Sequence, residues 1–284
     1  MATVSANGID HHVQFLPAGN GPTTPDTVVF IHGAFIDSLA SFYFTLGPRF
    51  TEAGFNAVMY DLRGHGRSER PGTGYMLQDF TADLTSLLDA LALPEPVHVI
   101  GNSFGGTLAF DLAVHHSHRV ASITVVESAP ATPQWAATMT AALHKATQEL
   151  PRDQALGWFV TEYGALASTR REDARHRAHI ARLGCSAGRL IATTTIAGDI
   201  PASRLLADDD IRSLTCPVLL VNGGDGLVAD QTTRLAGLLP DCRVAVVPGQ
   251  KHSVLVEAPD TVGPLILDWV REQAASQGVR KPSE

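Results

Sequence analysis

The chain has 284 residues, of which 44% are apolar and 18% charged. This balance excludes a disordered protein and suits one α/β domain with a sizeable insertion. The formal net charge of −8 comes from dispersed acidic residues and argues against nucleic acid and anionic membranes as partners. No apolar run reaches the roughly 18 residues of a membrane span, and the first residues lack the basic and apolar regions of a secretion signal. We therefore expect a cytoplasmic protein that acts on a small molecule, in an oligomeric state that the sequence leaves open.

The cysteines and histidines give no sign of a metal or cofactor site. Cys185, Cys216 and Cys242 lie far apart, are odd in number and lack the spacing of a zinc site, so reduced thiols are expected. His176 and His179 share a charged, helix-like stretch, but no third ligand accompanies them. We expect neither a metal nor a cofactor.

Short apolar runs rich in valine and isoleucine recur along the chain and predict strands. They span residues 27–32, 56–60, 97–102, 121–127, 217–222 and 242–248. The runs are nearly continuous rather than alternating, which is typical of strands covered on both faces of a parallel sheet. A weaker run at 11–17 predicts an antiparallel edge strand.

Helical patterns lie between these strands. One apolar stripe with helical spacing consists of Phe80, Leu84, Leu87, Leu88 and Leu91, and another lies within 262–270. Strands that alternate with helices predict right-handed βαβ units and a parallel sheet, hence an α/β fold. The long interval between the strands at 121–127 and 217–222 is rich in Ala, Arg, His and Thr, and predicts a mostly helical insertion.

The stretch "HVIGNSFGG" places Ser103 between a predicted strand and a predicted helix. A strand that ends in Gly-x-Ser-x-Gly and turns at once into a helix is a nucleophile elbow, in which the serine hydroxyl projects from the carboxyl edge of the sheet. Gly101 and Gly105 would remove side chains that collide in so sharp a turn. The alternative is a glycine-rich turn without chemistry, and the neighbouring motifs argue against it.

Two glycine-containing segments predict an oxyanion hole and its support. In "VVFIHGAF", Gly33 lets the backbone turn so that the N–H of Ala34, together with that of Phe104, points at the reaction centre. His32 and His65, the latter in "YDLRGHGRS", are expected to brace these loops rather than to take part in the chemistry.

A base and an acid follow later in the chain. His252 comes after the last predicted strand, in "GQKHS", and Asp225 follows a buried strand in "GGDG". A serine needs a neutral imidazole to take its proton and a carboxylate to fix the tautomer of that imidazole. We expect Ser103, Asp225 and His252 to form this triad. Glu127, at the end of the strand at 121–127, is the alternative acid.

These motifs together resemble the α/β-hydrolase superfamily, in its branch of capped, cofactor-independent serine hydrolases. "HGAF", "DLRGHGRS", "GNSFGG", "GGDGLV" and "GQKHS" stand in the order and spacing of that family, and the likeness covers roughly residues 8–128 and 213–275. It implies a mostly parallel, eight-stranded sheet with helices on both faces and a helical cap inserted after the sixth strand. The core would be 1–128 and 213–284, and the cap 129–212.

The resemblance implies a serine hydrolase that acts on an ester, thioester or related carbonyl of a small organic substrate. A serine at position 103 argues against haloalkane dehalogenases and epoxide hydrolases, which use aspartate there. A carbon–carbon bond hydrolase, whose elbow "GNSFGG" is similar, an acyl transferase and an eliminating enzyme of secondary metabolism stay open, as does a ligand-binding member without catalysis. Candidates for lining the substrate pocket are the aromatic residues Trp135, Trp158, Phe159 and Tyr163.

Overall fold

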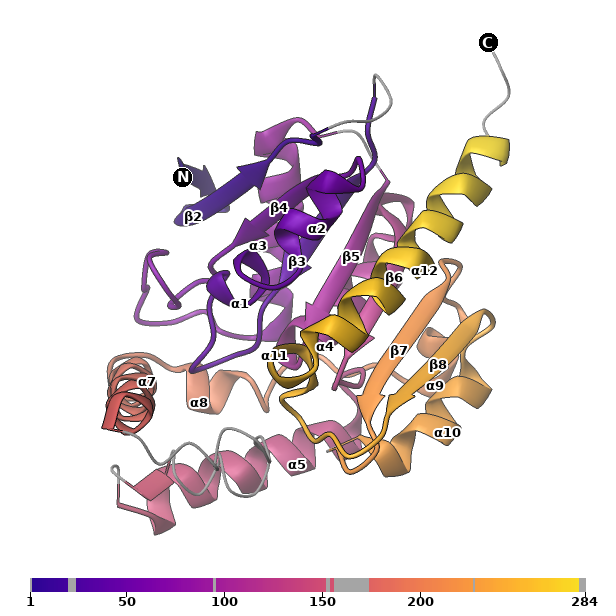
Figure 1. The fold of residues 1–284 in the computed structure, drawn as a ribbon. Helices are drawn as coiled ribbons and strands as arrows, with labels where there is room; N and C mark the ends of the chain where they lie inside the picture. Colours follow the sequence, from indigo (N-terminus) through magenta and orange to yellow (C-terminus); the bar gives the residue numbers. More distant parts are fainter. Residues whose placement is uncertain are drawn as a thin grey trace.

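A computed structural model describes residues 2–19, 24–93, 96–151, 154–155, 174–226 and 228–280 of the chain. They form one eight-stranded sheet with helices on both faces (Figure 1). The strands are β1 (Ala2–Ala6), β2 (Ile9–Leu16), β3 (Thr27–Ile31), β4 (Asn56–Tyr60), β5 (Val97–Asn102), β6 (Val120–Val126), β7 (Val218–Gly223) and β8 (Cys242–Val247). The predicted α/β fold is thus confirmed.

The strands run in the order β1-β2-β4-β3-β5-β6-β7-β8. All neighbours from β4 to β8 pair in parallel, whereas β1 with β2 and β2 with β4 pair antiparallel. The predicted antiparallel strand at 11–17 is therefore confirmed as β2, although it does not lie at the edge of the sheet. The edge is β1, which was not predicted and which joins β2 through a turn at Asn7 and Gly8, both with positive φ.

Helices connect the strands and fill the long interval before β7. They are α1 (Ala40–Tyr43), α2 (Gly47–Glu52), α3 (Leu77–Leu91), α4 (Phe104–His115), η1 (Ser117–Arg119), α5 (Pro133–His144), η2 (Lys145–Glu149), α7 (Ala174–Thr193), α8 (Ile196–Asp199), α9 (Asp208–Arg212), α10 (Ala229–Leu238), α11 (Val254–Glu257) and α12 (Pro259–Arg280). The element η2 is a π-helix that continues α5, and η1 is a short 3₁₀ turn.

Each face of the sheet supports its own core, which explains why the strand sequences are apolar without alternation. On β3, Val29 and Ile31 pack in the cluster that includes α3 and α4, whereas Val28 and Phe30 pack in the cluster that includes α2 and α12. All four are at most 1% exposed. A strand covered on both sides needs apolar residues at successive positions, and this is the pattern from which the parallel sheet was predicted.

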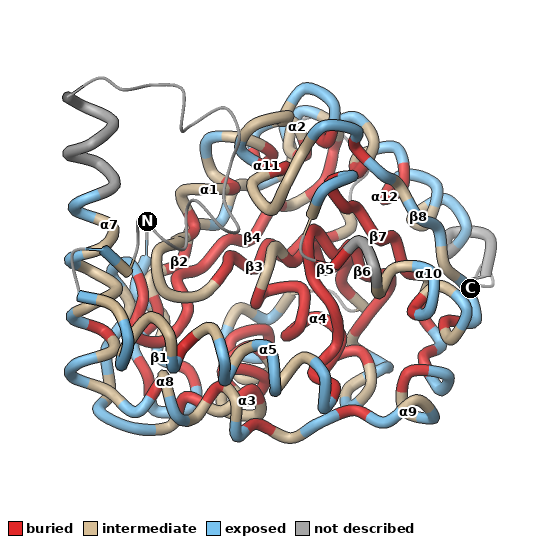
Figure 2. The backbone as a smooth tube through the Cα atoms, turned by 90° about the horizontal axis from the view of Figure 1, so that it is seen from below, coloured by how far each residue is buried: buried red, intermediate tan, exposed pale blue. Residues whose placement is uncertain are grey.

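The insertion between β6 and β7 is helical where the structure describes it. Helices α5, α7 and α8 lie beyond the carboxyl ends of the strands (Figure 1). Seen from that side, α5 and the coloured part of α7 are mostly intermediate or exposed, whereas β3 to β7 and α4 are mostly buried; α5 is drawn close to α4, and α7 to one side of the sheet (Figure 2). The insertion therefore lies over the edge of the sheet where the elbow ends.

The chain that leaves α8 is tied to the helix that follows the elbow. Arg204 donates from Nε to Asp111 Oδ1 at 2.7 Å, and its Nη2 donates to the other carboxylate oxygen. Asp111 lies on α4 and is fully buried. Ser203, next to Arg204, accepts the N–H of Leu77 at the start of α3 at 2.8 Å. These bonds fix one end of the insertion to the core.

Two further observations concern membranes and thiols. Within the described ranges, no helix combines the length and the apolar character needed to cross a membrane. Cys185 is exposed, Cys216 is buried and Cys242 is intermediate, and all three are free thiols.

Replacing Arg204 should destabilise the fold, because the buried carboxylate of Asp111 would lose its cationic partner. We expect Arg204→Met to lower the free energy of unfolding by about 3 kcal/mol, measured by urea unfolding. Arg212→Met is the matched control, since its partner Asp209 has a side chain 94% exposed. An exposed pair of this kind contributes at most about 1 kcal/mol. Equal losses in the two variants would contradict the structural role of Arg204.

Candidate active site

Ser103 occupies a strained turn between β5 and α4. Its φ of 53° and ψ of −125° lie outside the regions that a side chain normally allows. A Cβ atom on Gly101 would lie 2.2 Å from the carbonyl oxygen of Gly105, and one on Gly105 would lie 2.1 Å from that of Ile31. The turn therefore requires glycine on both sides of the serine for steric reasons, as the sequence predicted for a nucleophile elbow.

His252 meets the serine hydroxyl. Its Nε2 lies 2.9 Å from Ser103 Oγ, a normal hydrogen-bond distance. The histidine lies between β8 and α11, and its side chain is 13% exposed. Nε2 can accept the serine proton when Nδ1 carries the ring hydrogen, so the group that faces Nδ1 decides whether this tautomer is favoured.

The carboxylate that faces Nδ1 belongs to Glu127 rather than to Asp225. Glu127 Oε2 lies 3.4 Å from His252 Nδ1, and Glu127 Oε1 accepts the N–H of Gly223. The Glu127 side chain is fully buried, at the end of β6. Its backbone is left-handed, with φ of 50°.

Asp225, the expected acid, makes no contact with His252 in the described residues, and the alternative acid Glu127 lies at Nδ1 instead. Asp225 is exposed, and its backbone N–H donates to the carbonyl of Gln250 at 3.0 Å. The turn that follows β7 leaves Asp225 in solvent. The longer side chain of Glu127 reaches the imidazole from β6, the strand beside β7.

In the loop after β3, the N–H groups on either side of Ala34 are already bonded. Gly33 donates to Asp37 Oδ2 at 2.8 Å, Phe35 donates to His65 Nε2 at 2.8 Å, and Ile36 donates to the Ala34 carbonyl at 2.9 Å. Among the residues that the structure describes, no acceptor pairs with the N–H of Ala34. The predicted oxyanion donor is thus without an acceptor in the described part of the chain, as an oxyanion hole requires.

The second predicted donor is similarly free. Phe104 begins α4, where the first N–H groups have no partner within the helix. In the described part of the chain its N–H has no acceptor. The loop of Ala34 lies against the elbow, since a Cβ atom on Gly33 would lie 3.2 Å from Ser103 Cβ.

His32 and His65 both brace backbone, as the sequence indicated. His32 accepts the N–H of Leu62 at Nε2 at 3.0 Å, and its Nδ1 lies 2.7 Å from the Gly33 carbonyl. His65 Nδ1 lies 2.8 Å from the Arg63 carbonyl, which leaves Nε2 to accept from Phe35. Burial, and secondarily the neighbouring His32, lower the pKa of His65 from 6.5 to about 3. His65 therefore stays a neutral acceptor at ordinary pH.

Sequence reasoning missed Asp37. Its carboxylate accepts the N–H groups of Gly33 and Ser38, each at 2.8 Å, and the hydroxyl of Ser41. The signal was present, since an Asp followed by Ser within a loop commonly bonds nearby backbone N–H groups.

The proposed pocket aromatics are only partly placed. Trp135 lies on α5, half-buried against the larger core cluster. Trp158, Phe159 and Tyr163 lie outside the described residues. Across the described ranges, no group of three or more His, Cys, Asp or Glu side chains could hold a metal ion.

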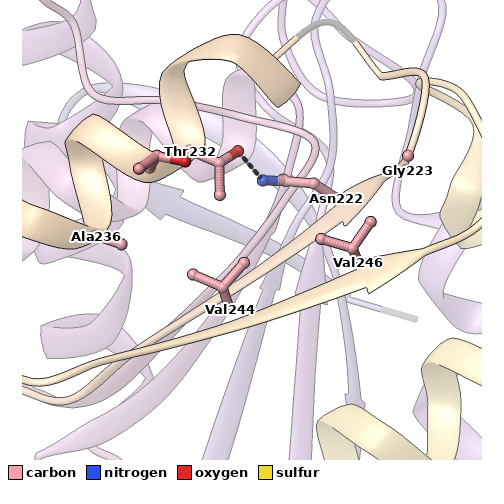
Figure 3. A pocket seen from close by; sticks show the side chains of 8 residues that line it. Asn222, Gly223, Thr232, Ala236, Val244 and Val246 are labelled. Atoms are coloured by element: carbon pink, nitrogen blue, oxygen red, sulfur yellow. Dashed lines mark hydrogen bonds between the residues drawn. The ribbon is translucent and has the colours of Figure 1, made fainter.

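A surface pocket of about 460 Å³ lies between β7, β8 and α10 (Figure 3). It is lined by Asn222, Gly223, Gly224, Thr232, Thr233, Ala236, Val244 and Val246. Neither Ser103 nor His252 lines it, but Gly223, whose N–H donates to Glu127 Oε1, does.

Comparison with known proteins identifies the family of the chain. Residues 26–259 match the family described as alpha/beta hydrolase fold, a span that includes Ser103, Glu127 and His252. The chain belongs to the α/β-hydrolase family. We therefore describe it as an α/β-fold hydrolase, an enzyme of that class.

Individual relatives of this α/β-hydrolase are distant. It is 27% identical over 258 residues to a 2-(acetamidomethylene)succinate hydrolase from Mesorhizobium japonicum, covering 89% of each chain. A thermophilic esterase from Thermogutta terrifontis is similar in structure, with a TM-score of 0.75, 20% identity and coverage of 96% of this chain and 98% of the esterase. A meta-cleavage product hydrolase from Pseudomonas fluorescens gives a TM-score of 0.75 at 19% identity, with the same coverages of 96% and 98%. The two structural similarities establish the fold alone.

The buried His65 should make the hydrolase acid-sensitive. Between its unfolded pKa of 6.5 and its folded pKa of about 3, the unfolded chain binds more protons at this residue than the folded one. The free energy of unfolding therefore falls as the pH falls through this window, by at most about 1.4 kcal/mol per pH unit from this group. Urea unfolding at pH 6 and pH 4.5 should show a larger loss for the wild type than for His65→Asn. Equal losses would contradict the assignment.

Proposed function

We propose that this α/β-hydrolase is a serine hydrolase that cleaves an ester, thioester or related carbonyl of a small organic substrate. Ser103 is the nucleophile, His252 the base and Glu127 the acid, with the N–H groups of Ala34 and Phe104 as the oxyanion hole. The observation that carries the proposal is the 2.9 Å contact between Ser103 Oγ and His252 Nε2, with the buried Glu127 carboxylate at the other ring nitrogen.

The reaction begins when Ser103 Oγ attacks the substrate carbonyl carbon and its proton passes to His252 Nε2. Glu127 holds the proton on Nδ1 and stabilises the imidazolium that forms. Because Glu127 is fully buried, solvent screens this charge interaction little. The new oxyanion accepts hydrogen bonds from Ala34 and Phe104, which face it without reorganisation.

Collapse of the tetrahedral intermediate expels the leaving group, which takes the proton from His252 Nε2. A water molecule then enters, gives a proton to His252 and attacks the acyl-enzyme. A second collapse, with the proton returned to Ser103 Oγ, releases the acid and the free enzyme.

We further propose that residues 129–212 form a cap that shapes the substrate pocket. The position of α5, α7 and α8 beyond the carboxyl ends of the strands supports this, as does the location of Trp135 on α5 (Figure 1).

A second candidate is hydrolysis of a carbon–carbon bond. The specific observation that favours it is the elbow "GNSFGG", together with a fold shared with a meta-cleavage product hydrolase. Turnover of p-nitrophenyl esters, acyl-thioesters and a ring-fission dienone separates the two functions. Preference for the dienone by more than about tenfold in kcat/KM would move the assignment to carbon–carbon cleavage.

The nucleophile is tested with a fluorophosphonate probe. We expect the probe to label Ser103, and Ser103→Ala to lose both labelling and esterase turnover, because no other group takes over the covalent step. Folding is checked by thermal melt. Unchanged turnover in Ser103→Ala would overturn the proposed function.

The acid is tested by two amide substitutions. An amide in place of the true acid keeps the shape but favours the wrong tautomer, which in a serine triad costs about 10⁴ in kcat. We expect Glu127→Gln to fall by several orders of magnitude near neutral pH, whereas Asp225→Asn stays within roughly tenfold, because Asp225 is exposed and does not contact the imidazole. The opposite ranking would return the acid to the loop after β7.

A further inference from the structure

The loop Gly223–Gly226, between β7 and α10, contacts Glu127, the proposed acid. It also contacts the segment Gln250–Lys251, which leads into His252, the proposed base. We propose that Gly223 and Gly226 are positioning residues that form a seat for the Glu127 carboxylate and set its spacing from His252. This inference rests on the proposed function, since it concerns the alignment of the acid with the base. Neither glycine touches substrate, and both act through the two side chains that they position.

Gly226 makes room for the carboxylate. A Cβ atom at this residue would lie 2.2 Å from Glu127 Oε1, 2.5 Å from Oε2 and 2.6 Å from Cδ. Gly226 is not among the residues with positive φ, so its backbone would tolerate alanine. What requires glycine here is the space that the Glu127 carboxylate occupies.

Gly223 acts on both partners. Its N–H donates to Glu127 Oε1, which holds the carboxylate that faces the imidazole. A Cβ atom on Gly223 would lie 2.3 Å from the carbonyl oxygen of Gln250 and 2.8 Å from that of Lys251. These carbonyls belong to the segment that leads directly into His252, so the loop packs backbone against backbone on the chain that carries the base.

Several bonds keep the loop in place. Asn222 Nδ2 donates to Thr232 Oγ1 at 2.8 Å, which fixes the start of the loop to α10 (Figure 3). Gly224 donates to the Val247 carbonyl and Asp225 to the Gln250 carbonyl, each at 3.0 Å. These hydrogen bonds hold the loop against the end of β8 and against Gln250, in the segment that leads into His252.

Gly224 shows that a tight turn alone does not explain the glycines. A Cβ atom on Gly224 would lie 3.6 Å from its nearest neighbour, an ordinary contact, and its φ is not positive. Within this loop, Gly223 and Gly226 therefore have no room for a Cβ atom, whereas Gly224 does. The two crowded glycines are those that lie against Glu127 or the segment before His252.

The decisive comparison is Gly226→Ala against its matched control Gly224→Ala, in the full-length chain. Displacing a catalytic group by about 1 Å can cost about 10² in rate. We expect kcat for p-nitrophenyl butyrate to fall at least about 100-fold in Gly226→Ala, with KM within about threefold, and to stay within about threefold in Gly224→Ala. The rate of fluorophosphonate labelling should fall with kcat, and both variants should melt near the wild type. Equal kcat in the two variants would contradict the proposal that Gly226 positions the Glu127 carboxylate.

Shortening the acid supplies the second test. Glu127→Asp withdraws the carboxylate from the added methyl group, so Glu127→Asp with Gly226→Ala should recover kcat at least about tenfold over Gly226→Ala alone. The same replacement should not rescue Gly223→Ala, whose clash is with backbone. Should Gly226→Ala alone fail to fold, a normal melt in the double variant supports the seat, and continued unfolding contradicts it. Absence of rescue in a folded double variant likewise overturns the inference.

The proposed function and the seat fail in different ways. Wild-type turnover in Ser103→Ala or Glu127→Gln contradicts the triad itself. Loss of activity in Glu127→Gln, combined with equal activity in Gly226→Ala and Gly224→Ala, leaves the triad in place and removes only the seat.

Discussion

The hydrogen bond between Ser103 Oγ and His252 Nε2 is the contact on which the arrangement of the site depends. It joins two residues 149 positions apart, each next to closely packed backbone at the carboxyl edge of the sheet. On the serine side, Gly101 and Gly105 let β5 and α4 approach to within atomic contact of each other and of β3. On the histidine side, Gly223 packs against the backbone of Gln250 and Lys251, which leads into His252. The imidazole lies between Ser103 at Nε2 and the Glu127 carboxylate at Nδ1.

Much of this could be predicted from the sequence, because steric and packing constraints leave local patterns. The glycines around Ser103 are required by the turn, and the apolar runs are required by cores on both faces of the sheet. His252 follows the last strand after a short loop, so its position at the carboxyl edge could be predicted from the position of that strand. The braces His32 and His65 were also predictable, since glycines beside them mark tight loops that need side-chain acceptors.

The acid could not be fixed in this way, because its choice depends on how a short loop turns. Asp225 and Glu127 both follow buried strands, and the sheet places those strands side by side. In the folded chain, the loop after β7 turns Asp225 into solvent, and the side chain of Glu127 from the end of β6 lies beside the imidazole. The strand β1 was missed for a different reason. Its sequence, "ATVSA", is short and only weakly apolar, and the Asn7–Gly8 turn was the stronger signal.

The ion pair between Arg204 and Asp111 has a consequence for the order in which the molecule is made. During synthesis, the helix behind the nucleophile emerges 93 residues before the arginine that neutralises its buried carboxylate. Gly223, which supplies a hydrogen bond to Glu127, emerges 96 residues after it. A nascent chain that ends before Arg204 thus holds Asp111 without its arginine and Glu127 without the donor Gly223, although Thr81 already donates to Asp111. Burying either one at that stage would carry an uncompensated desolvation cost. Burial of Asp111 and Glu127 is therefore less costly once Arg204 and Gly223 have been made, which links the surroundings of the elbow to the last third of the polypeptide.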